Sequence, residues 1–280
     1  MAIPLLQSTN NTTMKKTLKI VGIIFLVLMF ISTIVNVMVK PAYENSFEAQ
    51  IKRANRDCPI PVANGVGQVS SIYLDNNMLV YQLDYKPGFV NVDAYKTHPN
   101  AARDMFYLAF ICMNAQSGQG NMLIDKITSE GYGLRIVASD GSSSFTSDLT
   151  PQYISEMRRN IELNPSEALH DALVLKLQTE SGTYPIKADE GMVITGMELE
   201  DNNIVVLTTV DEDIYDISAF TAISDEFGQS LIDEANAGDP ELGTLMDLCK
   251  ISHSGIIYRI KGDQSNRHCD LSVRVKQLDV

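Results

Sequence analysis

The stretches "LDNNMLVY" (residues 74–81) and "EDNNIVVL" (200–207) are nearly the same phrase, written twice at a distance of 126 residues. In both, an Asp-Asn-Asn triplet separates two runs of the kind that forms strands. Asn and Asp tolerate a positive φ better than other residues, so the triplet is typical of a tight turn between antiparallel strands. The sequence therefore predicts the same β-hairpin at two places in one chain.

The likeness extends beyond these hairpins. At an offset of 126, residues 59–80 lie on 185–206, and at an offset of 122, residues 104–150 lie on 226–272 without gaps. Fifteen of the 69 aligned positions are identical, and the two windows come in the same order with a four-residue deletion between them. A repeat of this length indicates a tandem duplication.

The rest of each copy follows one order of predicted elements. Gly133 and Gly255 each stand before an alternating apolar run, where a helix ends and a second hairpin begins. Between its two hairpins each copy is helical, and in the first copy the apolar run 105–113 predicts a helix buried on nearly all sides. Each copy also opens with a helical run, 45–56 and 165–180.

The predicted unit is therefore α-β-β-α-α-β-β, repeated once. Hairpin-joined strands form antiparallel sheets, and helices segregated from such a sheet define the α+β class. We predict a first α+β repeat over residues 41–150, a linker with a short helix over 151–164, and a second α+β repeat over 165–280.

A membrane segment precedes the repeats. Residues 20–39 hold no charged side chain, and as a helix they would span about 30 Å, the thickness of the hydrocarbon core of a bilayer. Lys15, Lys16 and Lys19 precede this segment, and lysines favour the cytoplasmic side. The sequence predicts a cytoplasmic tail over 1–19, a transmembrane signal anchor over 20–39, and the remainder outside the cytoplasmic membrane, in the periplasm or at the cell surface.

Two alternatives stay open at this end of the chain. The stretch "STIVNVMVKPA" (32–42) lacks the small residues of a signal-peptidase site, which favours an uncleaved anchor over a cleaved signal peptide. Met14-Lys15-Lys16 is typical of a bacterial start, so residues 1–13 are either an upstream extension or a short cytoplasmic tail.

The charge distribution argues against one class of partner. The chain holds 22 basic and 35 acidic residues, a net charge of −13. The first 40 residues hold four lysines and no acidic residue, so residues 41–280 carry 18 basic and 35 acidic groups, a net charge of −17. Because residues 41–280 are this acidic, they repel phosphate backbones, and we predict that the protein does not bind nucleic acid. The charge is typical of a surface that keeps a domain soluble.

No pattern of catalytic or metal-binding residues stands out. The four cysteines fall at different places in the two copies and include no Cys-x-x-Cys motif: Cys58, Cys112, Cys249 and Cys269. The four histidines lack ligand spacing, and the acidic run "VDEDIYDIS" (210–218) fits a solvated strand end better than an EF-hand loop. We predict no catalytic residue, no cofactor and no metal, and we favour a binding protein over an enzyme.

The candidate binding residues lie where the copies differ, in "YKPGFVNVDAYKTHP" (85–99). Pro87-Gly88-Phe89 predicts an exposed turn that carries an aromatic side chain, and Tyr95 follows nearby. Exposed aromatic residues often anchor interfaces. Phe89 and Tyr95 are therefore candidates for contact with a partner, against the alternative that they pack on the helix below.

These observations favour one function and leave two others open. The favoured hypothesis is a membrane-anchored protein of the cell envelope whose duplicated α+β region binds a protein or another ligand of the envelope without catalysis. The alternatives are an envelope hydrolase with a site at the seam between the repeats, and a structural subunit of an envelope assembly.

Overall fold

The computed structural model of the chain describes residues 46–61, 66–112, 119–179, 184–222, 224–237, 240–265 and 267–273. None of the helices in these ranges is long and apolar enough to cross a membrane. The predicted transmembrane segment, 20–39, lies outside the described residues. The described residues divide between 182 and 183 into two compact units. The fold is mixed α+β with two five-stranded sheets, one in each unit.

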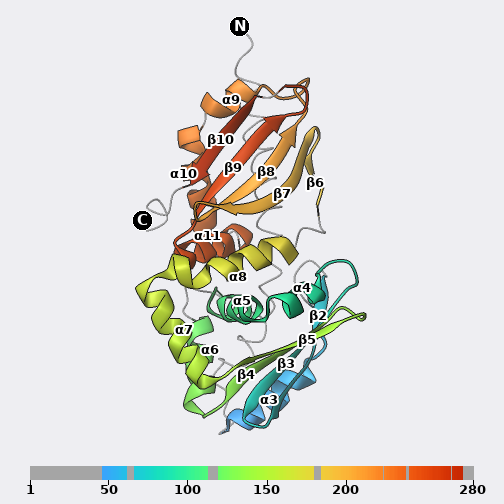
Figure 1. Ribbon diagram of the computed structural model, residues 1–280, viewed down its shortest axis with the longest axis vertical. Helices are drawn as coiled ribbons and strands as arrows, with labels where there is room; N and C mark the ends of the chain where they lie inside the picture. The colour runs from blue at the N-terminus through green and yellow to red at the C-terminus, as the bar shows by residue number, and fades with distance from the viewer. Residues whose placement is uncertain are drawn as a thin grey trace. The chain divides into compact units, whose positions relative to one another are not determined.

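The sheet of the first unit has the strand order β1-β2-β3-β4-β5 (Figure 1). Its strands are β1 (Ile60–Pro61), β2 (Gly67–Asp75), β3 (Met78–Tyr85), β4 (Gly133–Ser139) and β5 (Ser144–Leu149). Its described helices are α3 (Phe47–Arg56), α4 (Val92–Thr97), α5 (Pro99–Cys112), α6 (Gln119–Ser129), α7 (Pro151–Leu163) and α8 (Pro165–Thr179).

The second unit repeats this arrangement. Its strands are β6 (Ile186–Asp189), β7 (Met192–Glu200), β8 (Asn203–Val210), β9 (Gly255–Gly262) and β10 (His268–Val273), in the sheet order β10-β9-β8-β7-β6. Its described helices are α9 (Ile217–Ala222), α10 (Ser224–Asn236) and α11 (Pro240–Ser252). In both units three strands, three helices and two strands follow one another, which is consistent with a duplicated unit.

The sheets are mixed, so the predicted antiparallel sheet is wrong for the central pair of strands. β3 pairs with β4 in parallel, and β8 pairs with β9 in parallel. Three helices join each parallel pair, because parallel neighbours need a crossover of a dozen or more residues. The turn signals in the sequence identify each hairpin, whereas the direction in which two hairpins meet depends on the helices between them.

The Asn-rich turns form the predicted hairpins, with a one-residue difference in alignment. Asn76 and Asn77 have φ values of 47° and 59°, and Asp201 and Asn202 have the same two values. The equivalent turns are therefore 125 residues apart, and the Asp-Asn-Asn triplets are not in register. The shift falls after the first short strand, where β1 pairs Ile60 with Val69 but β6 pairs Ile186 with Ile194.

Apolar side chains from the central strands and the crossover helices form each core. In the first unit, Tyr81 of β3 is fully buried and meets Phe110 of α5 edge to face, with 5.5 Å between ring centroids. In the second, Tyr258 of β9 meets Phe227 of α10 at 5.3 Å in the same way. Edge-to-face packing of aromatic rings adds to the stabilisation from burial.

Helices α3 and α8 each precede a sheet in the chain but pack differently. α3 packs along β2, where Ser46 caps its first turn and Phe47, Ile51 and Ala54 are buried. α8, which we expected to open the second repeat, packs on α5 within the first unit. The predicted linker helix is α7, which Thr150 caps by accepting a hydrogen bond from the Tyr153 N–H.

The left-handed conformation of Asn77 yields a prediction. Asn77→Gly removes the steric conflict of the β-carbon at a φ of 59°, so we expect stability to be kept or raised. Asn77→Ala keeps the β-carbon and loses the polar side chain that favours a positive φ, so the free energy of unfolding should fall by about 1 kcal/mol. Denaturant unfolding of the two variants checks this; an equal loss of stability in both would contradict the assigned turn.

Candidate functional site

Among the described residues, the cysteines are not paired and the side chains that could ligate a metal do not cluster. All four cysteines lie in the described ranges and none is in a disulfide bond; burial raises the pKa of the Cys58 and Cys249 thiols, which disfavours reactive thiolates. Across the described residues, no group of three or more His, Cys, Asp or Glu side chains could hold a metal ion.

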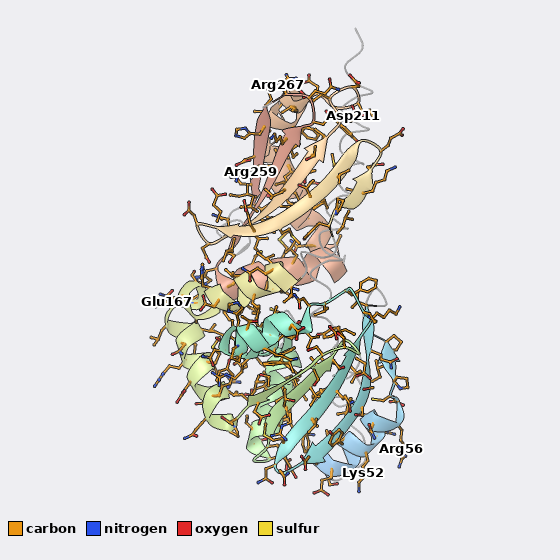
Figure 2. All side chains as sticks on the ribbon, turned by 45° about the vertical axis from the view of Figure 1, so that its right-hand side comes forward. Lys52, Arg56, Glu167, Asp211, Arg259 and Arg267 are labelled. Carbon is orange, nitrogen blue, oxygen red and sulfur yellow. The ribbon has the colours of Figure 1, made fainter. Side chains whose placement is uncertain are left out.

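The acidic run 210–218 has a structural role. Glu212 accepts hydrogen bonds from the backbone N–H of Ser265 at 2.6 Å, from the Ser265 hydroxyl at 2.8 Å and from the Arg267 guanidinium at 2.7 Å (Arg267 is labelled in Figure 2). These donors, the Ser265 hydroxyl first, lower the pKa of Glu212. Glu212 therefore holds the β9–β10 turn against the end of β8. Asp216 accepts from the N–H and hydroxyl of Ser218 at the start of α9.

The two predicted partner-binding residues lie in different surroundings. Phe89 follows the positive-φ turn residue Gly88 and is 42% exposed. Tyr95 of α4 is only 3% exposed, and its ring packs against Phe106 of α5 at 5.5 Å and Phe145 of β5 at 5.8 Å between centroids. Of the pair, Phe89 alone is placed to touch a partner, and Tyr95 belongs to the core.

A partly buried acid, Asp104 of α5, bonds to Tyr153 of α7. The Tyr153 hydroxyl donates to Asp104 at 2.5 Å, and the Arg103 guanidinium lies 4.2 Å above the Tyr153 ring. Burial is the main cause of the raised pKa of Asp104; the charge of Asp171 adds to it, and the hydrogen bond from Tyr153 and the charge of Arg103 oppose it. The Asp104–Tyr153 pair joins two packed helices and does not face the hollow that is described next.

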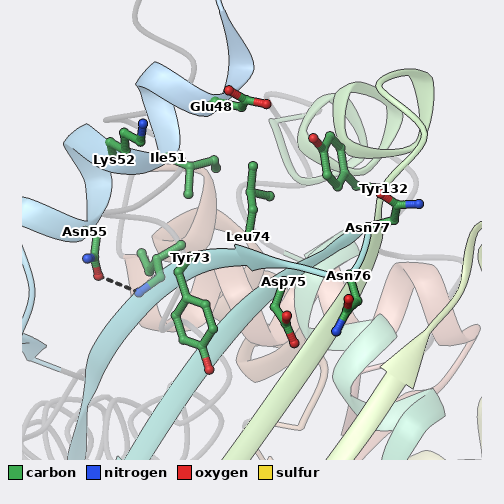
Figure 3. Close-up of a pocket in the computed structure, with 11 residues that line it drawn as sticks. Glu48, Ile51, Lys52, Asn55, Tyr73, Leu74, Asp75, Asn76, Asn77 and Tyr132 are labelled. Carbon is green, nitrogen blue, oxygen red and sulfur yellow. Dashed lines mark hydrogen bonds between the residues drawn. The ribbon is translucent and has the colours of Figure 1, made fainter.

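A hollow of about 460 Å³ separates α3 from the tip of the β2–β3 hairpin (Figure 3). α3 contributes Glu48, Ile51, Lys52 and Asn55, β2 and its turn contribute residues 72–77, and Tyr132 closes one end. In Figure 3 the side chains of Ile51 and Leu74 point toward each other across it. The volume is in the range of small-ligand sites, and the lining combines apolar, aromatic and amide groups. We call this hollow the α3–β2 groove.

One side of the α3–β2 groove is an open strand edge. The two-residue turn makes Asp75 and Met78 a hydrogen-bonded pair, so Leu74 and Ile72 direct their backbone groups away from β3. The Ile72 N–H confirms this direction, because it donates to the side-chain oxygen of Asn55 at 2.9 Å. Among the described strands, β1 pairs only with Gln68 and Val69 of β2 and none pairs with the outer side of Leu74, whose N–H and C=O therefore face the groove.

Sequence reasoning missed this site. The matching Asp-Asn-Asn triplets indicate a turn, and the residues before the first triplet indicate only a strand. Nothing in that strand pattern shows that Tyr73 is 42% exposed at the edge of a hollow. Two features of the sequence could have indicated the site. The helical run 45–56 carries the amide side chain of Asn55 near its end, and the hairpin 67–85 comes directly after this helix and one short strand. Their proximity depends on how α3 lies along β2, which no local pattern contains.

No family model matches the chain, and no curated protein matches it. Among solved structures, it resembles a presumed secreted protein of Pseudomonas aeruginosa with 13% sequence identity and a TM-score of 0.31. The match covers 42% of this chain and 96% of the other. A likeness at this TM-score supports no conclusion about fold or function.

The Asp104–Tyr153 pair yields a pH prediction. Because the folded state raises the pKa of Asp104 above its ordinary 3.8, its contribution to stability is complete below pH 3.8 and is lost as pH rises through the folded pKa. Asp104→Asn keeps an acceptor for Tyr153 without a partly buried charge, so the variant should gain stability relative to wild type between about pH 4 and pH 7.

Tyr153→Phe is the matched control. It leaves the ionised Asp104 without its hydroxyl donor and should lower the free energy of unfolding at pH 7 by about 1–3 kcal/mol. Urea unfolding at several pH values measures both effects. If the free energy of unfolding depends on pH in the same way in wild type and in Asp104→Asn, ionisation of Asp104 does not destabilise the folded state, and the prediction is wrong.

Proposed function

We propose that this chain is a non-catalytic binding protein of the cell envelope, anchored by residues 20–39, with both α+β units outside the cytoplasmic membrane. The charge-free run and the lysines before it support the anchor and its orientation. The net charge of −17 over residues 41–280 suits an exported, soluble region and disfavours nucleic acid as a partner.

The bound partner is an extended segment of another protein, lying in the α3–β2 groove. The observation that carries this proposal is the open edge at Leu74 inside a hollow of ligand size. An extended peptide gains affinity by pairing its backbone with such an edge, and neighbouring pockets select its side chains. Leu74 offers apolar contact beside the buried Ile51, and Tyr73, which is 42% exposed, offers an aromatic ring.

The charged groups of the groove suit binding better than acid–base catalysis. Glu48 and Asp75 are exposed, and Asp75 lies 3.6 Å from the Arg135 guanidinium. A catalytic carboxyl group is usually tuned by burial or by a like charge, and neither residue has such surroundings. The same groups can select a partner by charge at the rim of the groove.

The topology is tested with a reporter that is active only after export, fused behind Val280. We expect activity in intact cells, because the lysines keep residues 1–19 in the cytoplasm. A reporter that is active only in the cytoplasm would contradict the proposed localisation.

The groove is tested by photo-crosslinking in cell membranes, with a benzoylphenylalanine in place of Tyr73. We expect an adduct with one protein partner, lost when Leu74→Pro is added. That change removes the outward N–H but no bond to β3, and proline is tolerated where a strand N–H faces solvent.

The control carries the same photoreactive residue in place of Ile214, which is 43% exposed in the second unit. We expect no such adduct from this position. Equal adducts from both positions, or an adduct from position 73 that survives Leu74→Pro, would exclude pairing at the β2 edge.

A further inference from the structure

The solvent-facing side of α3 carries positive charge in a region of the chain that is otherwise acidic. Lys52, Arg53 and Arg56 are all exposed, and at 3.6 residues per turn they lie within about 100° of one another around the helix axis. The buried residues of α3 lie on the opposite side of the helix, and the acids at its two ends, Glu48 and Asp57, fall outside this sector. We call Lys52, Arg53 and Arg56 the basic face of α3.

Two cations of the basic face are not neutralised within the described structure. Among the described residues, no acid forms an ion pair with Lys52 or Arg56 (both labelled in Figure 2). Ion pairs with described acids are made instead by Lys96, Arg135, Arg158, Arg259 and Arg267. The exposed charges of Lys52 and Arg56 therefore favour a negatively charged surface outside the described structure.

The proposed anchor brings such a surface within reach of α3. Only residues 40–45 separate the charge-free run 20–39 from Ser46, the cap of α3. Fully extended, this stretch is at most about 25 Å long, and a helix of the length of α3 adds about 15 Å. A tether this short makes contact between α3 and the bilayer intramolecular, so a few charges are enough to hold it.

A bilayer with acidic phospholipids fits the charges of the first unit. Its surface is a plane of phosphate groups, and each Lys or Arg close to it favours binding by about fivefold. The rest of residues 41–280 is more acidic than the average for that region and is repelled by the same surface. Attraction at the basic face and repulsion elsewhere therefore favour contact through α3.

We propose that the basic face of α3 docks on the anionic phospholipid headgroups of the bilayer that holds the anchor. Lys52 and Arg56 meet the phosphates, while the buried side of α3 stays on β2. The proposal rests on the anchor of residues 20–39 and does not depend on a partner in the α3–β2 groove. The groove lies beside the basic face, since Glu48 and Asn55 line it and Arg56 does not.

The test uses the full chain in vesicles of phosphatidylcholine with brominated acyl chains, with and without phosphatidylglycerol. The chain contains no tryptophan, so Ala49→Trp places a single reporter within the sector of the basic face. Bromine quenches tryptophan fluorescence at short range. We expect quenching in vesicles that contain phosphatidylglycerol, and we expect it to weaken as salt rises because the contact is ionic.

Matched variants test the charges. Arg56→Gln, added to Ala49→Trp, should lower the ratio of docked to undocked chain about fivefold. Lys86→Gln removes the same charge from an exposed site after β3 and should leave the quenching unchanged. A tryptophan placed after β3 instead, by Phe89→Trp, should not be quenched. Melting temperatures equal to that of wild type show that the variants are folded.

Failure of the anchor and failure of the docking give different results. A chain that does not float with the vesicles would contradict the anchor and, with it, this proposal. For a chain that floats, equal quenching with and without phosphatidylglycerol, or equal effects of Arg56→Gln and Lys86→Gln, would overturn the docking alone. The same holds if quenching is absent and an acidic protein is captured by wild type but not by Arg56→Gln.

A second measurement needs no tryptophan and decides the question if Ala49→Trp does not fold. Lysines of the wild-type chain are acylated in both kinds of vesicle, and mass spectrometry follows Lys52 and Lys86. We expect phosphatidylglycerol to slow the modification of Lys52 several-fold and to leave that of Lys86 unchanged. Modification of Lys52 at one rate in both vesicles would overturn the proposal.

Discussion

The parallel pairing of the central strands is the constraint on which each unit depends. Parallel neighbours cannot be joined by a tight turn, so the chain must leave the sheet after β3 or β8 and return beside the same strand. The helices of that crossover then cover one face of the sheet. The central strands become the best-buried elements: Leu79 and Tyr81 of β3, and Ile204 and Val206 of β8, are fully buried.

The sequence contains the local parts of this fold but not the constraint itself. Asn76 and Asn77 identify a turn because few other residues adopt a positive φ, and the apolar run of α5 identifies a buried helix. The direction of β4 relative to β3 has no local signal. Short elements escape prediction for a related reason: α4 has six residues and its Tyr95 resembles a loop aromatic until Phe106 and Phe145 are seen around it.

Sheet edges connect the fold to the proposed function. An open edge presents unpaired N–H and C=O groups. Natural proteins cover such an edge with another element, place charged side chains on it, or pair it with another chain. The first unit covers most of its β2 edge with α3 and leaves Leu74 open in a hollow. The second unit places Glu198 and Glu200 on the corresponding strand instead. Among the described residues, a helix is docked at only one of these two edges, so the duplicated unit has two different surfaces at one structural position.

Amide hydrogen exchange of the full chain tests most directly whether the units are copies that differ at this edge. We predict slow exchange for the Ile72 N–H, which Asn55 accepts beneath α3, and fast exchange for the Met197 N–H at the corresponding position of β7. The amides of Tyr73 and Glu198, which face the partner strand, should be protected alike in both units. Equal protection of Ile72 and Met197, or fast exchange at both, would contradict a duplication whose copies differ at this edge.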